Sequence, residues 1–400
     1  MNLYDYAAFA AFEALLPPNL SDPLHNSKIV KNHTFQYLHL YMDSSTFAQR
    51  LLLWRKANPR PLPWKDHPDA YTIWLSEIIL QQTRVEQGLP YFERFRAKYP
   101  TVEALANAPE DEVMKLWEGL GYYSRARNLH GTAKMVASEL GGQFPETYEG
   151  LLQLKGVGAY TAAAIASFAY DLPHAVLDGN VFRVLARYLG IDLPTDSTEG
   201  KKLFARRAGE LMDAAQPAAY NQAIMDFGAT WCTPRNPKCS ACPMSPNCQA
   251  FQQKRVEQLP LKSKKIEKRD RFFHYLVLRA GGETLIRKRT DSDIWQQLYE
   301  FPMVEGEALT DDPKSLTQTL LWQELIGDND WSLRQIAGPF RQVLTHQKIV
   351  AVFFEIDLEM KQLPNTPPFI AVEQKNLNNF AFPKVIDCYL KDKSLYLRLV

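Results

Sequence analysis

The spacing of apolar residues changes once along the chain. After residue 45, apolar positions recur at helical spacing, as at Phe47, Leu51 and Trp54, and glycines and prolines break the helical segments. Further on, three segments are rich in Val, Ile, Phe and Tyr, as strands are: 272–279, 284–289 and 350–358. The pattern therefore predicts a multidomain chain, with an all-α domain over 45–250 and a smaller α+β domain over 272–400.

Two segments lie outside these predicted domains. Residues 1–44 contain several prolines and no sustained period, so we expect a poorly structured N-terminal extension. Met42 stands just before residues suited to capping a helix, which makes it the expected natural start. Residues 251–271 have few large apolar side chains and many cations, and we interpret them as a linker.

The totals describe an ordinary globular chain. Of its 400 residues, 46% are hydrophobic, enough for sizeable cores, and the net charge is +1. No overall field attracts a polyanion, so any basic surface must be local. No apolar run is long enough to span a membrane, and the N-terminus does not have the form of a signal peptide. We therefore expect a cytoplasmic protein with no membrane partner.

Four of the five cysteines crowd into one short run. Cys232, Cys239, Cys242 and Cys248 follow the order C-x6-C-x2-C-x5-C, in which only the central pair is close. Structural zinc sites favour two close pairs, so this spacing favours a cubane iron–sulfur cluster, one [4Fe-4S], over zinc. A pair of disulfides is the weaker alternative, because cytosolic thiols stay reduced. Cys388 stands alone and is expected to pack rather than react.

A turn with two glycines joins two predicted helices at Lys155, Gly156 and Gly158. Gly-x-Gly at a helix N-terminus lets backbone N–H groups point outward, which makes an anion nest suited to one phosphate of a nucleic-acid backbone. The pattern indicates a helix-hairpin-helix, although a plain tight turn between packed helices explains it equally well.

Two carboxylates are candidates for acid–base chemistry. Asp178 precedes the helical stretch 181–189, where the helix dipole would keep an anion ionised beside a developing cation. Glu77 shares a helix face with Ile73 and Trp74, so desolvation should raise its pKa, as a general acid requires. Each also has a plain structural explanation, since Asp178 is a good helix cap and Glu77 could lie on a helix shoulder.

Further motifs stand around these features in a fixed order. They are Leu62-Pro-Trp64, Trp74-Leu-Ser-Glu-Ile-Ile-Leu-Gln-Gln-Thr-Arg84, Trp117-Glu-Gly-Leu-Gly-Tyr-Tyr-Ser-Arg125, Gly156-Val-Gly-Ala-Tyr-Thr161, Leu177-Asp-Gly-Asn-Val181, Tyr220-Asn-Gln-Ala-Ile-Met-Asp-Phe-Gly228 and the four cysteines. With them the chain resembles the endonuclease III superfamily of DNA glycosylases, and within it the MutY family of adenine DNA glycosylases.

The resemblance implies an activity and a setting. It implies a base excision repair enzyme that hydrolyses the N-glycosidic bond of adenine mispaired with 8-oxoguanine or guanine. The implied partner is double-stranded DNA with an adenine mispair, bound by a monomer associated with the bacterial nucleoid.

The resemblance also implies catalytic roles. Glu77 matches the acid that protonates the adenine ring, and Asp178 matches the carboxylate that stabilises the sugar cation and helps to deliver water. Tyr160 stands at the hairpin position where bifunctional relatives carry a Schiff-base lysine, which implies a monofunctional enzyme.

The implied DNA contacts fall into two groups. Three residues match the pocket around the flipped adenine: Arg60, Trp64 and Asp226. Others match contacts to the duplex: Gln82, Tyr122, Lys155, Gly156 and Gly158. Among them Tyr122 corresponds to the aromatic wedge beside the oxidised guanine, Gln82 probes the same step, and Lys155 stands where the family usually has proline.

The C-terminal part resembles the MutT-like (Nudix-fold) domain of the same family, through Leu285-Ile-Arg-Lys-Arg289 and Trp295-Gln-Gln-Leu-Tyr-Glu-Phe-Pro302. The acidic metal-binding helix of active nucleotide hydrolases, R-E-x-x-E-E, is absent from its sequence. The resemblance therefore implies a recognition domain. Leu344, Thr345 and His346 fall where the family's oxidised-guanine loop lies, although that loop often reads Phe-Ser-His.

Two other functions remain open at this point. The alternative enzyme is an endonuclease III-like or thymine-mismatch DNA glycosylase; Tyr160 disfavours the lyase, and the MutT-like tail disfavours both. The non-enzymatic alternative is an iron–sulfur DNA-binding sensor, which needs neither Glu77 nor Asp178.

Overall fold

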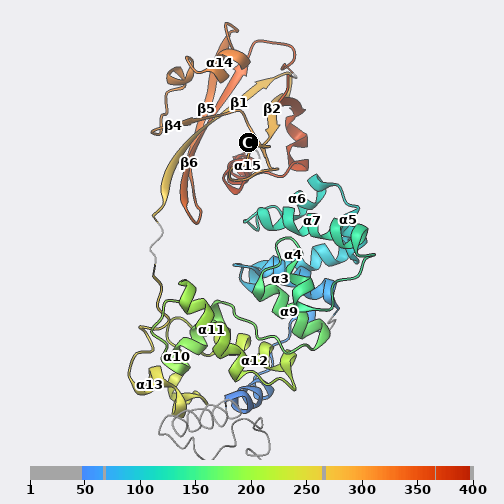
Figure 1. Cartoon of the computed structure of the whole chain (residues 1–400). Helices are drawn as coiled ribbons and strands as arrows, with labels where there is room; N and C mark the ends of the chain where they lie inside the picture. The colour runs from blue at the N-terminus through green and yellow to red at the C-terminus, as the bar shows by residue number, and fades with distance from the viewer. Residues whose placement is uncertain (1–46, 66–68, 264–266, 365, 397–400) are drawn as a thin grey trace, which may run out of the picture.

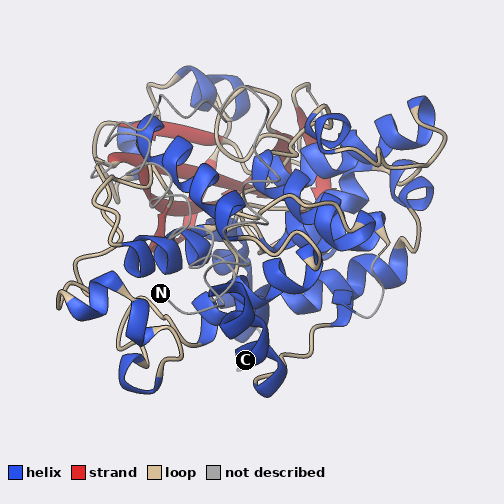
Figure 2. Ribbon diagram, turned by 60° about the horizontal axis from the view of Figure 1, so that its bottom comes forward, coloured by secondary structure: helices blue, strands red, loops and turns tan. Residues whose placement is uncertain are grey.

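The computed structural model describes residues 47–65, 69–263, 267–364 and 366–396. In this part the chain forms a helical half followed by a strand-rich half (Figures 1 and 2). This confirms the predicted fold class. The predicted N-terminal extension, residues 1–44, lies outside the described residues.

The helical half begins with a helix over residues 47–57 and a short 3-10 turn, η2 (Pro63–Lys65). It continues with α3 (Ala70–Leu80), α4 (Val85–Lys98), α5 (Val102–Ala106), α6 (Glu110–Trp117), α7 (Ser124–Glu139), α8 (Tyr148–Leu152), α9 (Ala159–Tyr170), α10 (Gly179–Leu189), α11 (Thr198–Leu211), α12 (Pro217–Thr230) and α13 (Gln249–Gln252). Polar caps begin several of them. The Asp69 carboxylate, for example, accepts a hydrogen bond from the Thr72 N–H at the start of α3.

Helix α9 lies between two apolar cores. Ala162 and Ile165 belong to the core built with α3 to α7, while Ala163 and Ala164 belong to the core built with α10 and α12. A helix buried on both sides is apolar all round, and small alanine side chains let its neighbours approach closely. Tyr160, in the first turn of α9, packs against the core built with α10 and α12.

The strand-rich half is one twisted sheet with helices on its faces. Its strands are β1 (Arg269–Ala280), β2 (Glu283–Lys288), β3 (Tyr299–Glu300), β4 (Met303–Gly306), β5 (Trp331–Val343), β6 (Gln347–Leu358) and β7 (Phe369–Glu373). Their order is β3-β2-β1-β6-β5, with β4 paired to β1 and β7 to β2, and β1 and β6 run parallel. The helices are α14 (Leu320–Leu325) and α15 (Lys384–Tyr396).

Alternation along β1 fixes which helix covers which face. Phe273 and Tyr275 belong to the core that contains α15, and Leu276 and Leu278 belong to the core that contains α14. Successive strand residues point to opposite faces, so a continuous apolar run is what a strand buried on both faces requires. Cys388, expected to pack, is instead exposed on α15, so that expectation was wrong.

Much of the predicted linker, 251–271, lies against the helical half. The Leu259 carbonyl accepts a hydrogen bond from Arg187 at 3.1 Å, and the Leu261 carbonyl accepts one from the Thr195 N–H at 3.0 Å. Strand β1 then starts at Arg269. The described part of the predicted linker, up to residue 263, is therefore packed on the helical half through its backbone.

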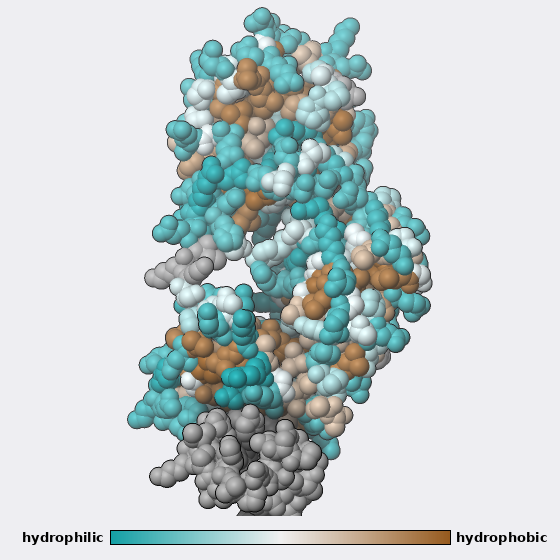
Figure 3. All heavy atoms as spheres, viewed as in Figure 1, coloured by the Kyte–Doolittle hydropathy of each residue, from teal (hydrophilic) through white to brown (hydrophobic). Residues whose placement is uncertain are grey.

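The two halves also contact each other directly, at α6 and α7 (Figure 1). The Lys288 ammonium lies 2.6 Å from the Asp111 carboxylate, and Arg127 donates to the Gln296 carbonyl at 2.8 Å. Figure 3 shows a hollow bordered by hydrophilic residues between the strand-rich half and the lower helices. The β5–β6 hairpin projects from the sheet toward the helical half (Figure 1). Among the described residues, no helix has the length and apolar character needed to cross a membrane.

Candidate active site

Glu77 lies in the middle of α3, a helix that is buried on all sides. Every residue from Tyr71 to Ile79 is buried, and Glu77 itself is only 7% exposed. A carboxyl group in such a place loses its water shell, which penalises the charged form. Burial accordingly raises the pKa of Glu77 from 4.5 to about 7.

Tyr160 is the hydrogen-bond partner of this acid. Its hydroxyl donates to Glu77 Oε2 at 2.7 Å and lies 3.4 Å from the Met225 sulfur. A donor favours the ionised carboxylate, so this bond lowers the pKa of Glu77 against the larger effect of burial. Burial and the nearby Glu77 carboxyl raise the pKa of Tyr160 well above 10, which keeps the phenol protonated.

Asp178 approaches the same place from α10, whose N-cap it forms. Its carboxylate accepts hydrogen bonds from the Asn180 N–H at 2.8 Å, from the Val181 N–H at 2.7 Å and from the Asn180 side chain at 2.7 Å. Burial raises the pKa of Asp178, and these donors oppose the shift. Because the Asp178 charge also raises the pKa of Glu77, the two carboxyl groups act on each other across the site.

A charged cluster is formed where α12 meets η2. Asp226, 2% exposed, pairs with Lys65 at 3.0 Å and with Arg60 at 3.3 Å. Desolvation lowers the pKa of Lys65 despite the attraction of Asp226. The structure brings Arg60 and Asp226 together as the pocket prediction needs, whereas Trp64 is buried with its ring edge-on to Phe92 at 5.3 Å.

Gln82 and Tyr122 are both exposed on left-handed backbone, with φ of 55° and 49°. Tyr122 is 48% exposed. Non-glycine residues adopt this conformation rarely, and usually where the surrounding structure holds it. Arg125 supplies that support, because its guanidinium donates to the Ile79 carbonyl near the end of α3 and lies 5.4 Å from the Tyr122 ring centroid.

The two-glycine turn between α8 and α9 has the geometry of the predicted hairpin. Gly156 has φ of 79°, and a Cβ there would lie 2.9 Å from the Asn128 side chain, so this position needs glycine. A Cβ at Gly158 would meet nothing within 4 Å, so the turn has an open surface at the N-terminus of α9. Lys155 is exposed beside it.

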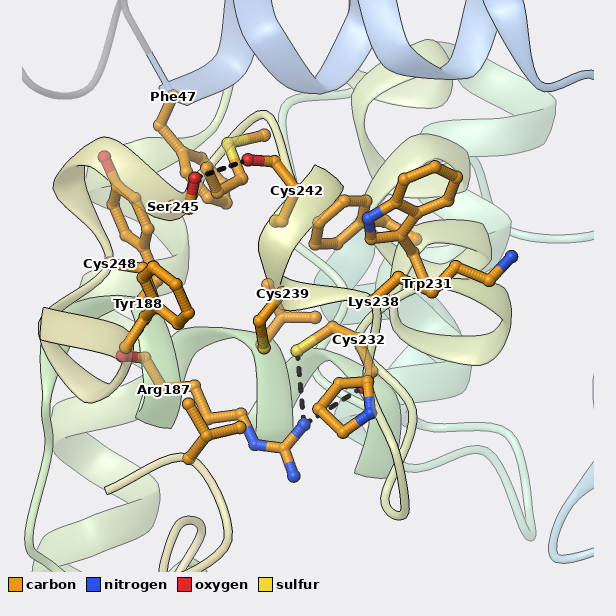
Figure 4. Close-up of a pocket in the computed structure, with 16 residues that line it drawn as sticks. Phe47, Arg187, Tyr188, Trp231, Cys232, Lys238, Cys239, Cys242, Ser245 and Cys248 are labelled. Carbon is orange, nitrogen blue, oxygen red and sulfur yellow. Dashed lines mark hydrogen bonds between the residues drawn. The ribbon is translucent and has the colours of Figure 1, made fainter. Parts of the chain in front are cut away.

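The four cysteines Cys232, Cys239, Cys242 and Cys248 line one cavity after α12 (Figure 4). They form no disulfide, and burial raises the pKa of the Cys242 thiol to about 11. Such thiols become thiolates when a metal centre replaces their protons. In the described part of the chain, no three His, Cys, Asp or Glu side chains lie close enough together to hold a single metal ion. Four thiols spread around an otherwise apolar cavity fit a cluster larger than one ion.

Arg183 and Arg187, one turn apart on α10, connect this cavity to the carboxylates. Arg183 donates to the Asn180 side chain at 2.9 Å and to the Cys232 carbonyl at 2.8 Å. Arg187 lies 3.4 Å from the Cys232 sulfur. Since Asn180 also binds Asp178, a continuous hydrogen-bonded path runs from Asp178 to the cysteine loop. The sequence analysis missed both arginines. Their spacing of four residues, which places two cations on one face of a helix, was the pattern that could have indicated them.

The predicted oxidised-guanine loop lies at the turn of the β5–β6 hairpin. Thr345 and His346 are exposed there, while Leu344 is half-buried against the core. The Leu344 N–H donates to the Gln347 carbonyl at 2.8 Å, which closes the turn. The hairpin therefore exposes the polar side chains of Thr345 and His346, while Leu344 is anchored against the core.

Comparison with known protein families agrees with this layout. The family "HhH-GPD superfamily base excision DNA repair protein" matches residues 75–209, the iron-sulfur binding domain of endonuclease III matches residues 232–248, and the NUDIX domain matches residues 274–392. A fold with these domains and a buried acid beside a second carboxylate defines the base excision DNA glycosylases, and this chain is an enzyme of that class.

Individual relatives narrow the class further. The adenine DNA glycosylase of Buchnera aphidicola subsp. Schizaphis graminum is 39% identical over 278 residues, which cover 67% of this chain and 78% of that protein. The adenine DNA glycosylase of Mus musculus is 34% identical over 386 residues, covering 82% of this chain and 75% of that protein. A solved thermostable thymine-DNA glycosylase is 30% identical, covering 52% of this chain and 97% of its own, with a TM-score of 0.49.

The chain belongs to the adenine DNA glycosylase family. This confirms the resemblance stated from the sequence and sets aside the endonuclease III-like, thymine-mismatch and sensor alternatives. The cluster is of the [4Fe-4S] kind, as predicted. As a member of this DNA glycosylase family, the protein binds DNA.

Proposed function

We propose that this chain hydrolyses the N-glycosidic bond of adenine mispaired with 8-oxoguanine or guanine in double-stranded DNA. The observation that carries the proposal is the buried Glu77–Tyr160 pair beside Asp178. Breaking this bond leaves an oxocarbenium-like sugar and an anionic base. The reaction therefore needs a proton donor for the base and a carboxylate near the sugar.

Glu77 and Asp178 divide these tasks between them. With a pKa of about 7, Glu77 still holds its proton near neutral pH and can give it to the departing adenine. Asp178 accepts hydrogen bonds from the N-terminus of α10, which favour its anionic form, and that anion stabilises the sugar cation and orients the attacking water.

Tyr160 supports a hydrolytic, monofunctional reaction. A glycosylase that also cleaves the strand uses an amine to form a Schiff base with the sugar, and a protonated phenol cannot do so. Lys155, the cation at the hairpin turn, is exposed beside Gly156 and is placed for a phosphate. Water is therefore the proposed nucleophile.

Access to the bond requires the adenine to leave the duplex. The exposed ring of Tyr122 is suited to fill the vacated stack, with Gln82 beside the same step, and the Gly156–Gly158 turn is suited to hold a phosphate. Asp226, with Arg60 and Lys65, offers charged groups to the edge of the flipped base.

The strand-rich half is proposed to read the opposite base. Thr345 and His346 present polar groups at a hairpin that points toward the helical half, across the hydrophilic hollow of Figure 3. A duplex held in this hollow would meet both halves of one monomer, on nucleoid DNA in the cytoplasm. The cluster, when bound to the four cysteines, cross-links the loop that follows α12 and so has a structural role.

Variants of the reading loop test this proposal. His346→Ala and Thr345→Ala in the full chain should lower the single-turnover preference for 8-oxoguanine over guanine opposite adenine by about tenfold, as the loss of one base contact does. Excision opposite guanine should change little. Lys361→Ala, at an exposed residue beyond the opposite end of β6, is the control. An unchanged preference in both loop variants would show that this hairpin does not read the oxidised base.

A further inference from the structure

The segment between α6 and α7, residues 118–123, is held by the strand-rich half as well as by its own helices. It carries three left-handed residues, Gly119, Gly121 and Tyr122, with φ of 89°, 79° and 49°. A Cβ at Gly119 would lie 2.8 Å from the Tyr91 hydroxyl. Glycine adopts a positive φ readily, but for Tyr122 this conformation is unfavourable and persists only where the surrounding structure fixes it.

The fixing contacts come from residues 380–382, just before α15. Lys115 donates to the Phe380 carbonyl at 2.9 Å, and the Phe382 N–H donates to Glu118 Oε1 at 2.8 Å. The Tyr123 hydroxyl donates to the Phe382 carbonyl at 3.4 Å. Both polar groups of the Phe382 backbone are thus bound by side chains that flank Tyr122.

These contacts form one connected unit. Glu118 is also ion-paired with Lys115, so the two side chains hold the 380–382 backbone together. Tyr123 accepts a hydrogen bond from the Gly119 N–H at 3.2 Å, which ties the same contact to the turn. On the other side, Arg125 lies 5.4 Å from the Tyr122 ring centroid. Tyr122 is therefore supported by the helical half through Arg125 and by the strand-rich half through Glu118.

We infer that Glu118 is a positioning residue that transmits the docking of the strand-rich half to Tyr122. The inference rests on the proposed role of Tyr122 as the wedge in DNA. The strand-rich half, which reads the opposite base, and the Tyr122 ring, which fills the vacated stack, then move together. They contact neighbouring positions of the duplex. Loss of the Glu118–Phe382 bond releases the 118–123 segment, and Tyr122 loses its left-handed position.

A second contact between the halves offers a matched control. Asp111, in the first turn of α6, binds Lys288 at 2.6 Å and the Tyr299 hydroxyl at 3.0 Å. It joins the same two halves as Glu118 does but lies outside the 118–123 segment. Asp111→Ala therefore weakens the contact between the two halves away from Tyr122, whereas Glu118→Ala weakens this contact beside Tyr122.

The experiment is a double-mutant cycle in the full chain. Glu118→Ala, Glu118→Gln and Asp111→Ala are each made alone and with Tyr122→Ser. Single-turnover excision is measured on a duplex with adenine opposite 8-oxoguanine. The fluorescence of 2-aminopurine beside the 8-oxoguanine reports unstacking by the wedge. Circular dichroism and the cluster absorbance report folding.

The inference predicts a loss that depends on Tyr122. Glu118→Ala should lower excision about tenfold, the effect of losing one hydrogen bond to a charged group, and reduce the 2-aminopurine signal. With Tyr122→Ser present, it should change excision less than about twofold, because residues in one pathway are not additive. Glu118→Gln keeps the acceptor oxygen and should restore most of the rate, and Asp111→Ala should leave the fluorescence signal unchanged.

Three results would overturn the inference while the wedge role of Tyr122 stands. They are a wild-type rate for Glu118→Ala, an equal loss in both Tyr122 backgrounds, or a loss in Asp111→Ala with the same fluorescence change. If Tyr122→Ser alone retains the wild-type rate and signal, the wedge role fails and the inference fails with it. Because that result comes from the single Tyr122 variant, it is distinguishable from a failure at Glu118.

Discussion

The Tyr160 hydroxyl donates a hydrogen bond to Glu77 Oε2 at 2.7 Å. The bond joins the first turn of α9, directly after the two-glycine turn, to the middle of α3. It opposes the effect of burial on Glu77, whose pKa is about 7. A residue at the hairpin therefore adjusts the proton affinity of the acid, and the first predictions concern this pair.

Glu77→Gln should remove the proton donor while leaving the fold intact. Because general acid catalysis contributes about 10²–10⁴-fold, single-turnover adenine excision should fall by at least about a hundredfold. Binding to the mispaired duplex should persist, since the proton acts on the transition state. Glu139→Gln, an exposed change on α7, is the control. A rate within tenfold of the wild type would remove Glu77 from the mechanism.

The same substitution should stabilise the protein above neutral pH. The pKa of Glu77 is raised from 4.5 to about 7 on folding, so ionisation of this group opposes folding increasingly as pH rises through that window. At 1.36 kcal/mol per unit, the penalty reaches about 3 kcal/mol at alkaline pH. Thermal unfolding at pH about 8 should show Glu77→Gln melting above the wild type, and the difference should shrink below pH about 5. Equal melting temperatures at both pH values would contradict the buried-acid account.

Tyr160→Phe should move the pH dependence of excision. The lost hydrogen bond favours the carboxylate, so its removal raises the pKa of Glu77 further. The protonated acid then persists to higher pH, and the alkaline decline of the single-turnover rate should shift upward by about one unit. Tyr170→Phe, at the far end of α9, is the control. A shift toward lower pH would contradict the described bond.

Asp178→Asn should separate the structural role of this residue from its chemical role. Asparagine caps helices about as well as aspartate, so α10 should keep its start. The negative charge beside the sugar is lost, and excision should fall by about 10²–10⁴-fold. Asp69→Asn, which caps α3 in the same way, should keep both rate and stability. If circular dichroism shows Asp178→Asn to be unfolded, its main contribution is the cap.

Cys242→Ser should disrupt the cluster and Cys388→Ser should not. Cys242 lines the common cavity, whereas Cys388 is exposed on α15. Purified wild type should contain about four iron atoms and a broad thiolate–iron absorption band. Cys242→Ser should lose much of both, and its unfolding temperature should fall, because metal binding contributes to folding. Stoichiometric zinc in place of iron in the wild type would contradict the assignment.

The sequence predicts elements and local chemistry better than it predicts long-range contacts. The helical register alone places Glu77 among apolar neighbours, and the cysteine spacing alone favours the cluster. The Tyr160–Glu77 bond spans 83 positions along the chain, and no local pattern announces it. The same holds for Arg125, whose partners become visible only when α3 and α7 are packed together.

The relation between the two halves was the main feature that the sequence did not predict. Composition separates them at a charged segment, which the sequence analysis interprets as a linker, and it predicts no contact between them. In the structure, one apolar cluster includes Trp117 of α6 and Phe382 before α15, and the polar contacts of Asp111 and Glu118 lie around it. This interface combines residues that lie 169 or more positions apart in the polar contacts described. Each of them looks like an ordinary core or surface residue in its own segment.

The most direct measurement is a single-turnover reaction of the full chain on duplexes that pair adenine with 8-oxoguanine, guanine or thymine, or thymine with guanine, with borohydride present. The account predicts free adenine, fastest opposite 8-oxoguanine, an abasic strand that breaks only after added base, and little covalent protein–DNA adduct. Release of thymine as the main product would contradict the proposed substrate. Efficient adduct formation would show that an amine such as Lys155, and not water, attacks the sugar.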